Sequence, residues 1–313
     1  EDILLLESNV SGFFRAQAQT YVNPPEHFEE FIRRTMGDGI AEHFMIPYNT
    51  KLWTLPPGQM SYQWCQRFVP TPSAEEVVYG ALRPEGSGKS IGYNATFFYP
   101  QNGGMGTLAQ RLAKTLAHEL RLGCSVESID WQKKQVWLSN KGLLPYQYLV
   151  STLPLSDLLK CLQPLPEAIA DAAHKLRAVS VTYWDVGLLG ANGPADAHWT
   201  YFPDSEIPFY RAGSATAAVP SLAPKGYRTL YVECSHPRGE TCRVSEEAVL
   251  QGLRRTGLIG ENEEPVWMAK NTIDCAYVLM DQAYGSARQT ILEWLKAHSI
   301  ESIGRYGAWT YDS

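Results

Sequence analysis

Apolar side chains recur at helical spacing soon after the start of the chain, within residues 26–45. These positions lie mostly three or four residues apart, at Phe28, Phe31, Ile32, Met36 and Ile40. The spacing predicts a helix, and Gly37 and Gly39 interrupt its period. Residues 45–70 carry four prolines among many aromatic side chains, so we expect an irregular segment there.

The middle of the chain combines one amphipathic helix with short strands. Residues 97–120 begin with a glycine-rich turn, and leucines then follow along one helical stripe at Leu108, Leu112, Leu116 and Leu120. Three β-like runs come next, at residues 124–131, 134–140 and 146–154. Because short turns containing lysine separate these runs, they predict a small β-meander.

The second half of the chain alternates between helical and strand-like patterns. Helical spacing is found in residues 155–177, 246–256 and 286–298. Strand-like patterns are found in residues 180–190, 198–202 and 228–234. The succession of helices and strands predicts a mixed α/β (α+β) fold.

Composition excludes several classes of partner. The 313 residues carry a net charge of −6, so no basic surplus is available to neutralise nucleic-acid phosphates. No run of about 18 apolar residues occurs, which argues against a membrane span. The six cysteines are scattered and lack the spacing of a metal site, so we expect free thiols, no bound metal and a reducing, cytoplasmic location.

The motifs of common hydrolases do not occur in the sequence. It contains neither H-E-x-x-H nor G-x-S-x-G, and no side-chain nucleophile is identified. The segment PEGSGKS at residues 84–90 is not a Walker phosphate-binding loop, because Arg83 stands where the first glycine belongs. Aromatic residues gather around prolines and glycines, which suits either a pocket for a flat or sugar-like ligand or ordinary loop packing.

Six segments, in this order, resemble the UDP-galactopyranose mutase-like branch of the amine oxidase and protoporphyrinogen oxidase superfamily. They are PYNTKLW with QRFVP (47–53 and 66–70), YPQNGGMGTLAQRLA (99–113), YQYLVSTLPL (146–155), YFPDSEIPFYR (201–211), AYVLMD (276–281) and IGRYGAWTYDS (303–313). The resemblance covers nearly the whole chain and rests on the order of the segments.

This resemblance implies a flavoenzyme with FAD as its cofactor and a small-molecule substrate, either a nucleotide sugar or an amine-like compound. It assigns to substrate binding Tyr48, Trp53, Arg67, Arg211, Tyr277 and Tyr311, with Lys51 beside them. It assigns to the flavin Gly103, Gly104, Met105, Gly106 and Arg305. Arginine suits a pyrophosphate because its planar guanidinium can donate two parallel hydrogen bonds. The alternative for each residue is structural, either a solvated surface charge or a side chain packed in the core.

The sequence departs from this family at the cofactor motif. The family begins with a strand, a Gly-x-Gly-x-x-Gly turn and a helix that together receive the FAD pyrophosphate, and no such motif occurs here. The first residues, EDILLLESNV, read like the middle of a protein rather than a signal peptide. We therefore expect a fragment, or a chain without some of its parts, that lacks the main FAD-anchoring segment.

The resemblance also predicts a division into domains. A partial FAD-binding domain is expected from residues 91–155 and 300–313, and a substrate domain with a mixed sheet and helices from residues 26–90 and 156–299. Residues 1–25 are not assigned to either domain. The one location suggested for them is the edge of the FAD domain. Between the two domains we expect a convergence of Arg67, Arg211, Tyr277, Arg305 and Tyr311.

Three functions are compatible with the sequence. The first is a mutase-like rearrangement of a nucleotide-diphosphate sugar by reduced flavin, which the positions Arg211 and Tyr311 favour. The second is an FAD-dependent oxidoreductase that takes a hydride from a small organic substrate. The third is a non-catalytic fragment that lacks its FAD-anchoring motif. The oligomeric state is not predicted.

Overall fold

The structure is a computed structural model of the chain. It describes residues 2–69, 71–82, 98–100, 102–116, 119–139, 142–190 and 198–311. The side chains of Gln66 and Arg67 and the segment PEGSGKS lie outside the described part. The fold mixes helices with antiparallel and parallel strand pairs, which confirms the predicted mixed α/β class.

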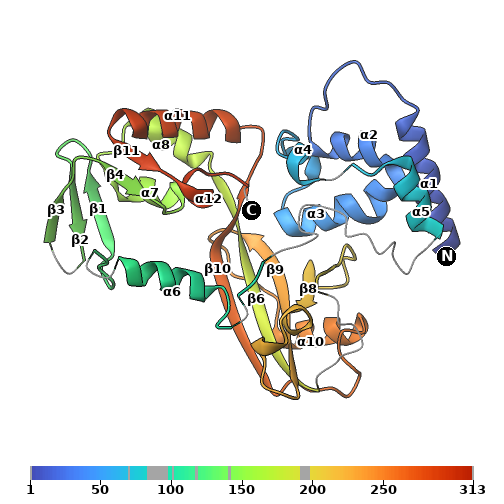
Figure 1. Ribbon diagram of the computed structural model, residues 1–313. Coiled ribbons are helices and arrows are strands. Elements are labelled where there is room, and N and C mark those ends of the chain that lie inside the picture. The colour runs from blue at the N-terminus through green and yellow to red at the C-terminus, as the bar shows by residue number, and fades with distance from the viewer. Residues whose placement is uncertain are drawn as a thin grey trace. The chain divides into compact units, whose positions relative to one another are not determined.

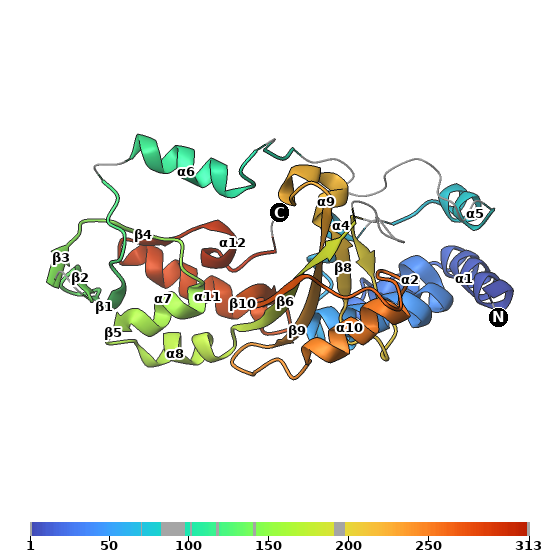
Figure 2. The ribbon, with the colours of Figure 1, turned by 90° about the horizontal axis from the view of Figure 1, so that it is seen from below.

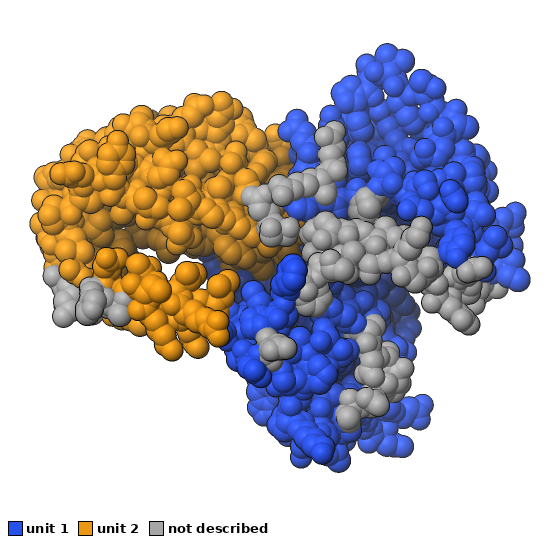
Figure 3. All heavy atoms as spheres, viewed as in Figure 1, with its two compact units in different colours: residues 1–107, 180–274 blue, residues 108–179, 275–313 orange. Residues whose placement is uncertain are grey.

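The chain divides into two compact units, which Figure 3 shows in different colours. Unit 1 contains residues 1–107 and 180–274, and unit 2 contains residues 108–179 and 275–313. The chain therefore passes between the units three times. The predicted assignment of one domain to FAD and the other to the substrate stays a prediction.

Unit 1 begins with a group of helices (Figure 1). They are α1 (Asp2–Gln17), α2 (Phe28–Ile40), the π-helical turn η1 (Ala41–Met45), α3 (Ile46–Trp53), the 3-10 turn η2 (Pro57–Gln59), α4 (Cys65–Phe68) and α5 (Ala74–Leu82). The helix predicted within residues 26–45 is confirmed. The irregular segment predicted for residues 45–70 is wrong at its start, where α3 is helical. Helix α3 continues directly from η1, and Pro47 lies in its first turn.

Helices α1 and α2 cross at glycines and lie side by side in Figure 1. A Cβ atom on Gly37 would lie 2.3 Å from the carbonyl carbon of Gly12, and one on Gly39 would lie 2.5 Å from the carbonyl oxygen of Ser8. Gly37 also has φ 79° and ψ 166°, a backbone conformation that is essentially restricted to glycine. The two glycines that interrupt the apolar period therefore allow two helix backbones to touch.

The rest of unit 1 is built on a five-stranded sheet with the order β10-β6-β9-β8-β7. Its strands are β6 (Arg177–Leu189), β7 (Thr200–Tyr201), β8 (Arg211–Ser214), β9 (Tyr227–Pro237) and β10 (Trp267–Leu279). The ends of β6 and β10 at residues 177–179 and 275–279 belong to unit 2. The three strands predicted in this part are confirmed as β6, β7 and β9. β10 was not predicted.

Short helices accompany this sheet, namely α9 (Ala215–Ala218), the 3-10 turn η3 (Pro220–Leu222) and α10 (Glu246–Arg255). Val249 and Leu253 of α10 share one buried cluster with Trp184 of β6 and Leu230 of β9. Helix α10 therefore covers one face of the sheet, as Figure 2 shows. Its position matches the helix predicted at residues 246–256.

Unit 2 contains two small sheets. The first has the order β3-β2-β1-β5, and its strands are β1 (Val126–Asp130), β2 (Gln135–Leu138), β3 (Gly142–Pro145) and β5 (Leu162–Gln163). The second is a parallel pair of β4 (Leu149–Ser151) and β11 (Ile300–Ser302). The predicted meander is thus confirmed for its first two runs and wrong for the third, which pairs with β11.

The helices of unit 2 are α7 (Leu155–Cys161), α8 (Glu167–His174), α11 (Tyr284–Ala297) and α12 (Gly304–Gly307), together with most of α6 (Gly106–Thr115). Pro164 and Pro166 divide the helical stretch predicted at residues 155–177 into α7 and α8. Leu155, Leu158 and Ile291 are fully buried in the core of this unit. Helix α6 carries two of the four predicted stripe leucines, Leu108 and Leu112, while Leu116 and Leu120 lie beyond its end. All four leucines are exposed, and α6 buries no side chain among the described residues.

Candidate functional site

In unit 2, Arg305 lies among three tyrosines. Its guanidinium carbon is 5.4 Å from the ring centre of Tyr277, 5.6 Å from that of Tyr306 and 5.1 Å from that of Tyr311. The rings of Tyr277 and Tyr311 are themselves 6.1 Å apart. Arg305, Tyr277 and Tyr311 were all assigned to the site from the sequence, and the fold brings them together. We call these four residues the Arg305 cluster.

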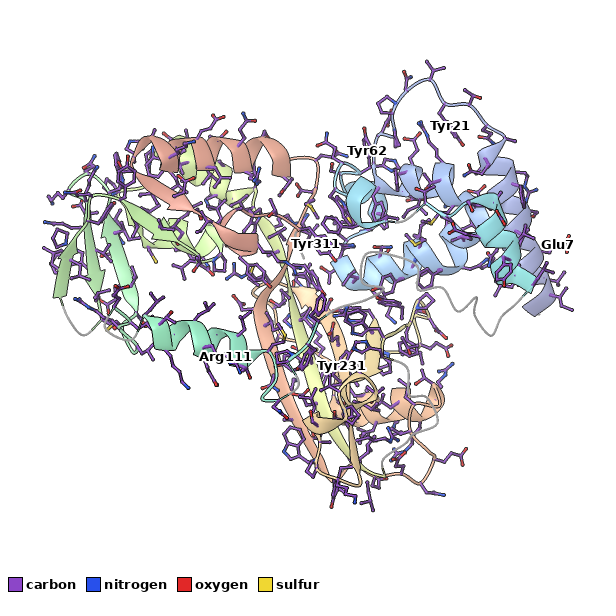
Figure 4. The ribbon with its side chains drawn as sticks, in the orientation of Figure 1. Glu7, Tyr21, Tyr62, Arg111, Tyr231 and Tyr311 are labelled. Carbon is purple, nitrogen blue, oxygen red and sulfur yellow. The ribbon has the colours of Figure 1, made fainter. Side chains whose placement is uncertain are left out.

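Helix α11 holds the chain segment that carries Arg305 and Tyr311. The hydroxyl of Tyr284 donates a hydrogen bond to the carbonyl of Trp309 over 2.6 Å, and Nε of Arg288 donates to the carbonyl of Ala308 over 2.6 Å. The indole of Trp309 is fully buried in the core. These contacts hold the backbone at residues 308 and 309 against α11. Tyr311, labelled in Figure 4, follows this anchored segment.

The hydroxyl of Tyr306 in this cluster is a hydrogen-bond donor. Burial raises the pKa of Tyr306, although the nearby Arg305 charge opposes this effect. The phenol therefore stays protonated at neutral pH, and it donates to the carbonyl of Ala276 over 3.2 Å. Arg305 therefore supplies this cluster with a permanent positive charge among aromatic rings, and a guanidinium can donate hydrogen bonds to oxyanions such as phosphates.

In unit 1, Arg211 is paired with a carboxylate that was not predicted. Arg211 and Glu233 lie opposite each other on β8 and β9. Nη2 of Arg211 donates to both carboxylate oxygens of Glu233, over 2.8 Å and 2.7 Å, and Nε donates to one of them over 3.1 Å. The hydroxyl of Tyr210 donates to the same carboxylate. Both charged side chains are largely buried, with 20% and 15% of their surfaces exposed.

Aromatic rings surround this ion pair. The guanidinium carbon of Arg211 lies 5.4 Å from the ring centre of Trp199. Tyr48, which was assigned to the site from the sequence, packs edge-on against Tyr201 and Tyr210 at ring distances of 5.1 Å and 6.3 Å. The fold thus brings Tyr48 near Arg211 through its aromatic neighbours.

Tyr231, labelled in Figure 4, projects from β9 on the same side as Glu233. Its hydroxyl donates to the carbonyl of His198 over 2.7 Å. Burial raises the pKa of Tyr231, so this phenol also stays protonated at neutral pH. It therefore adds a neutral donor, and not a negative charge, to the surroundings of Arg211.

Lys51 holds a loop rather than facing an open site. Its Nζ lies within hydrogen-bonding distance of four backbone carbonyls, those of Phe202, Asp204, Ile207 and Phe209, at distances of 2.7–2.9 Å. Burial lowers the pKa of Lys51 to about 8, so the amine is still protonated at neutral pH. An ammonium has three N–H donors, and the four carbonyls occupy them.

Replacing Lys51 with methionine is expected to lower the free energy of unfolding by about 2 kcal/mol, because it leaves carbonyls in the 202–209 loop without donors. Urea unfolding of the variant measures this loss. Lys225→Met is the matched control, since Lys225 is exposed and the same substitution there should leave the transition unchanged. Equal unfolding midpoints for the two variants would show that the loop does not depend on Lys51.

The remaining predicted residues do not join either cluster in the described structure. Trp53 is 1% exposed, donates from Nε1 to Oδ1 of Asn49 over 3.1 Å and packs edge-on against Trp64. These contacts are those of a core side chain, the structural alternative that the sequence left open. Arg67 lies in α4 and its side chain is outside the described part. The expected convergence of residues from both units stays a prediction.

Sequence reasoning missed four residues that complete the two clusters, namely Trp199, Tyr210, Glu233 and Tyr306. Tyr210 and Tyr306 are chain neighbours of Arg211 and Arg305, so the motifs that carried the arginines already contained them. Glu233 had no such signal, because only the register of β8 against β9 places it opposite Arg211.

Comparison with known proteins identifies the family. A family model described as flavin containing amine oxidoreductase matches residues 7–187. Because this match covers more than half of the chain, the protein belongs to that family. Within the family the chain is UDP-galactopyranose mutase-like: a crystal structure of reduced UDP-galactopyranose mutase is 29% identical to it, with a TM-score of 0.88. The resemblance inferred from the sequence is confirmed, and so is FAD as the cofactor of this group.

Coverage differs between the two chains. The comparison spans 97% of this chain and 66% of the mutase chain, so the chain spans just under two thirds of that protein's length. A structure assigned as a protoporphyrinogen oxidase from Exiguobacterium sp. 255-15 is 17% identical, with a TM-score of 0.69 over 97% of this chain and 69% of its own. Putrescine oxidase bound to putrescine is 15% identical, with a TM-score of 0.57 over 99% of this chain and 71% of its own. These two structures share the fold of this chain.

The glycine turn at residues 103–106 is compatible with the flat flavin ring of FAD, the role predicted for it from the sequence. Gly103 and Gly104 have φ of 79° and 67°. Among the described residues, a Cβ atom on Gly104 would meet the hydroxyl of Tyr99 at 3.5 Å, and one on Gly103 would lie 2.5 Å from Oγ1 of Thr107. This bare backbone leads into α6, beside the exposed Met105 and Gly106, and it permits the close approach of a flat ring. The Gly-x-Gly-x-x-Gly turn that would bind the FAD pyrophosphate does not occur in this sequence.

Two negative findings complete the site description. Within the described ranges, no cluster of three or more histidine, cysteine, aspartate or glutamate side chains is arranged to hold a metal ion. None of the helices in the described part combines the length and the apolar character that crossing a membrane requires.

Proposed function

We propose that the protein rearranges a nucleotide-diphosphate sugar in an FAD-dependent, mutase-like reaction. The observation that carries this proposal is that Tyr277 and Tyr311, both assigned to the substrate, lie 6.1 Å apart in the Arg305 cluster, beside a permanent cation. A polar cluster of this kind suits an anionic substrate. The similarity to the mutase over 97% of the chain supports the same substrate class.

The proposed task of the protein side chains is to hold the substrate. Tyr277 and Tyr311 of the Arg305 cluster are proposed to contact the pyrophosphate, which lies away from the bonds that change, so that this binding energy positions the sugar. Arg211 has the same proposed role. Arg305, with the glycine turn at Gly103 and Gly104, is proposed to lie against the flavin ring. Reduced FAD, when bound, supplies the electron-rich centre that activates the sugar, so no side-chain nucleophile is required.

An amine or related oxidoreductase is the second candidate. The family description favours it, since its members are flavin containing amine oxidoreductases. Such an enzyme transfers a hydride from the substrate to the flavin and would be served better by an apolar or aromatic pocket than by an arginine. The aromatic rings around Tyr48 suit this alternative.

One experiment on the full-length gene product separates these functions. The visible spectrum is recorded before and after dithionite, and UDP-galactopyranose and UDP-galactofuranose are then offered without oxygen. Interconversion of the two sugars by the reduced protein, and not by the oxidised protein, supports the mutase. A flavin spectrum without interconversion, together with oxygen consumption on an amine, moves the assignment to the oxidase. A colourless protein that stays inactive after added FAD contradicts both.

A further inference from the structure

The carboxylate of Glu233 is bound by the same donors of Arg211 that would hold a phosphate. An arginine side chain binds phosphates and carboxylates alike, through parallel N–H donors on one edge of its guanidinium. Here Nε and Nη2 of Arg211 both donate to Oε2 of Glu233, over 3.1 Å and 2.7 Å, and Nη2 also donates to Oε1 over 2.8 Å. This edge of Arg211 is therefore engaged by an oxyanion that belongs to the chain itself.

The same carboxylate has a second, neutral donor. The hydroxyl of Tyr210 donates to Oε2 of Glu233, and Tyr210 is only 1% exposed. The register of β8 against β9 places Arg211 and Glu233 directly opposite each other. A guanidinium and a phenol that converge on one carboxylate form an oxyanion site, and a side chain of the protein fills it.

Solvent reaches this site from the side of β7. The backbone of Tyr201 pairs with that of Arg211 across β7 and β8, so the two side chains lie on the same face of the sheet. Tyr201 keeps 41% of its surface exposed, and the side chain of Arg211 keeps 20%. An anion from solution can therefore approach Arg211 alongside the ring of Tyr201.

A diphosphate is suited to displace the carboxylate. It carries more negative charge and more acceptor oxygens than a carboxylate, so it forms stronger charge-assisted hydrogen bonds with the same donors. The displacement leaves the largely buried Glu233 without its cation, which costs free energy. This cost lowers the apparent affinity for the ligand, as in any protein of which only a fraction is competent to bind.

We propose that Glu233 competes with the substrate for Arg211: in the free protein its carboxylate fills the phosphate site, and the substrate diphosphate displaces it. This inference rests on the proposed function, in which Arg211 contacts the pyrophosphate. Glu233 is then a specificity-determining residue, because only an anion that binds Arg211 more strongly than the carboxylate does can use this contact.

Binding of UDP and of uridine to the full-length protein, measured by isothermal titration calorimetry, tests the proposal. We expect Glu233→Gln to bind UDP about tenfold more tightly than the unaltered protein, since the neutral amide competes less for Arg211. The affinity for uridine, which has no phosphate, should not change. Glu206→Gln is the matched control, because Glu206 forms an exposed ion pair with Arg255 and should alter neither affinity.

The Arg211→Ala background distinguishes displacement from charge repulsion alone. Removal of the negative charge at Glu233 favours any nearby anion, with or without Arg211. Without Arg211 no contact is left to compete for, so Glu233→Gln should then improve UDP binding by about twofold at most. An equal improvement in both backgrounds, or weaker UDP binding by Glu233→Gln alone, would overturn the proposal. If neither the unaltered protein nor Glu233→Gln binds UDP, the proposed function fails, and this inference with it.

A second variant keeps the test valid if glutamine disturbs the fold, which urea unfolding shows. Glu233→Asp retains the charge but is shorter by one methylene, so its carboxylate is drawn back from Arg211. It should therefore bind UDP about threefold more tightly than the unaltered protein, whereas repulsion alone predicts no improvement. UDP affinity that is unchanged in Glu233→Asp contradicts the displacement.

Discussion

Replacing Gly37 with alanine is expected to lower the free energy of unfolding of unit 1 by roughly 2–5 kcal/mol. The added Cβ would lie 2.3 Å from the backbone of Gly12 in α1, and backbone atoms cannot move aside as a flexible side chain can. The conformation at φ 79° and ψ 166° adds a further cost for any residue with a Cβ. Urea unfolding gives the stability, and hydrogen exchange of the α1 amides shows whether that helix separates from α2.

Gly80→Ala is the matched control for this substitution. Gly80 lies in α5, where an added Cβ meets nothing within 4 Å, so alanine there should stabilise the helix slightly, by up to about 1 kcal/mol. If Gly37→Ala leaves the α1 amides as protected as in the unaltered protein, the close crossing of α1 and α2 does not limit the stability of unit 1.

The apolar patterns predicted those elements that bury one regular face. The helical period gave α2, α10 and α11. The strand patterns gave β9, whose buried residues alternate with partly exposed ones, and β6, which is buried on both faces over most of its length. β10 was missed because residues 270–274 are exposed on both faces and include polar side chains, so no period marks them. In α3, Pro47 at the start concealed a helix that buries Leu52 and Trp53.

The two clusters differ in how much of them the sequence could predict. Arg305, Tyr277 and Tyr311 came from motifs, and the fold places all three in one unit, which supports reading them as a group. The partners of Lys51 could not be predicted, because they are backbone carbonyls more than 150 positions away and every residue type carries one. Sequence alone therefore identified the charged residues but not what they bind within the protein.

The ion pair between Arg211 and Glu233 determines how the role of Arg211 can be tested. Arg211→Ala in the full-length enzyme is expected to raise the KM for a nucleotide-diphosphate sugar about 100-fold, because a charge-assisted contact to the pyrophosphate is lost. The same change should lower the free energy of unfolding by about 2 kcal/mol, since it leaves the largely buried carboxylate of Glu233 without its cation. The variant Arg211→Ala therefore does not by itself distinguish a role in substrate binding from a role in stability.

The double variant Arg211→Ala, Glu233→Gln separates these two roles. Glutamine removes the charge that would otherwise stay unpaired, while the hydroxyl of Tyr210 can still donate to its amide oxygen. We expect most of the lost stability to return and the KM to stay about 100-fold raised. Arg255→Ala is the control, because Arg255 forms only an exposed ion pair with Glu206 and should change neither quantity. A KM that recovers together with stability in the double variant would mean that Arg211 serves the fold and does not bind the substrate.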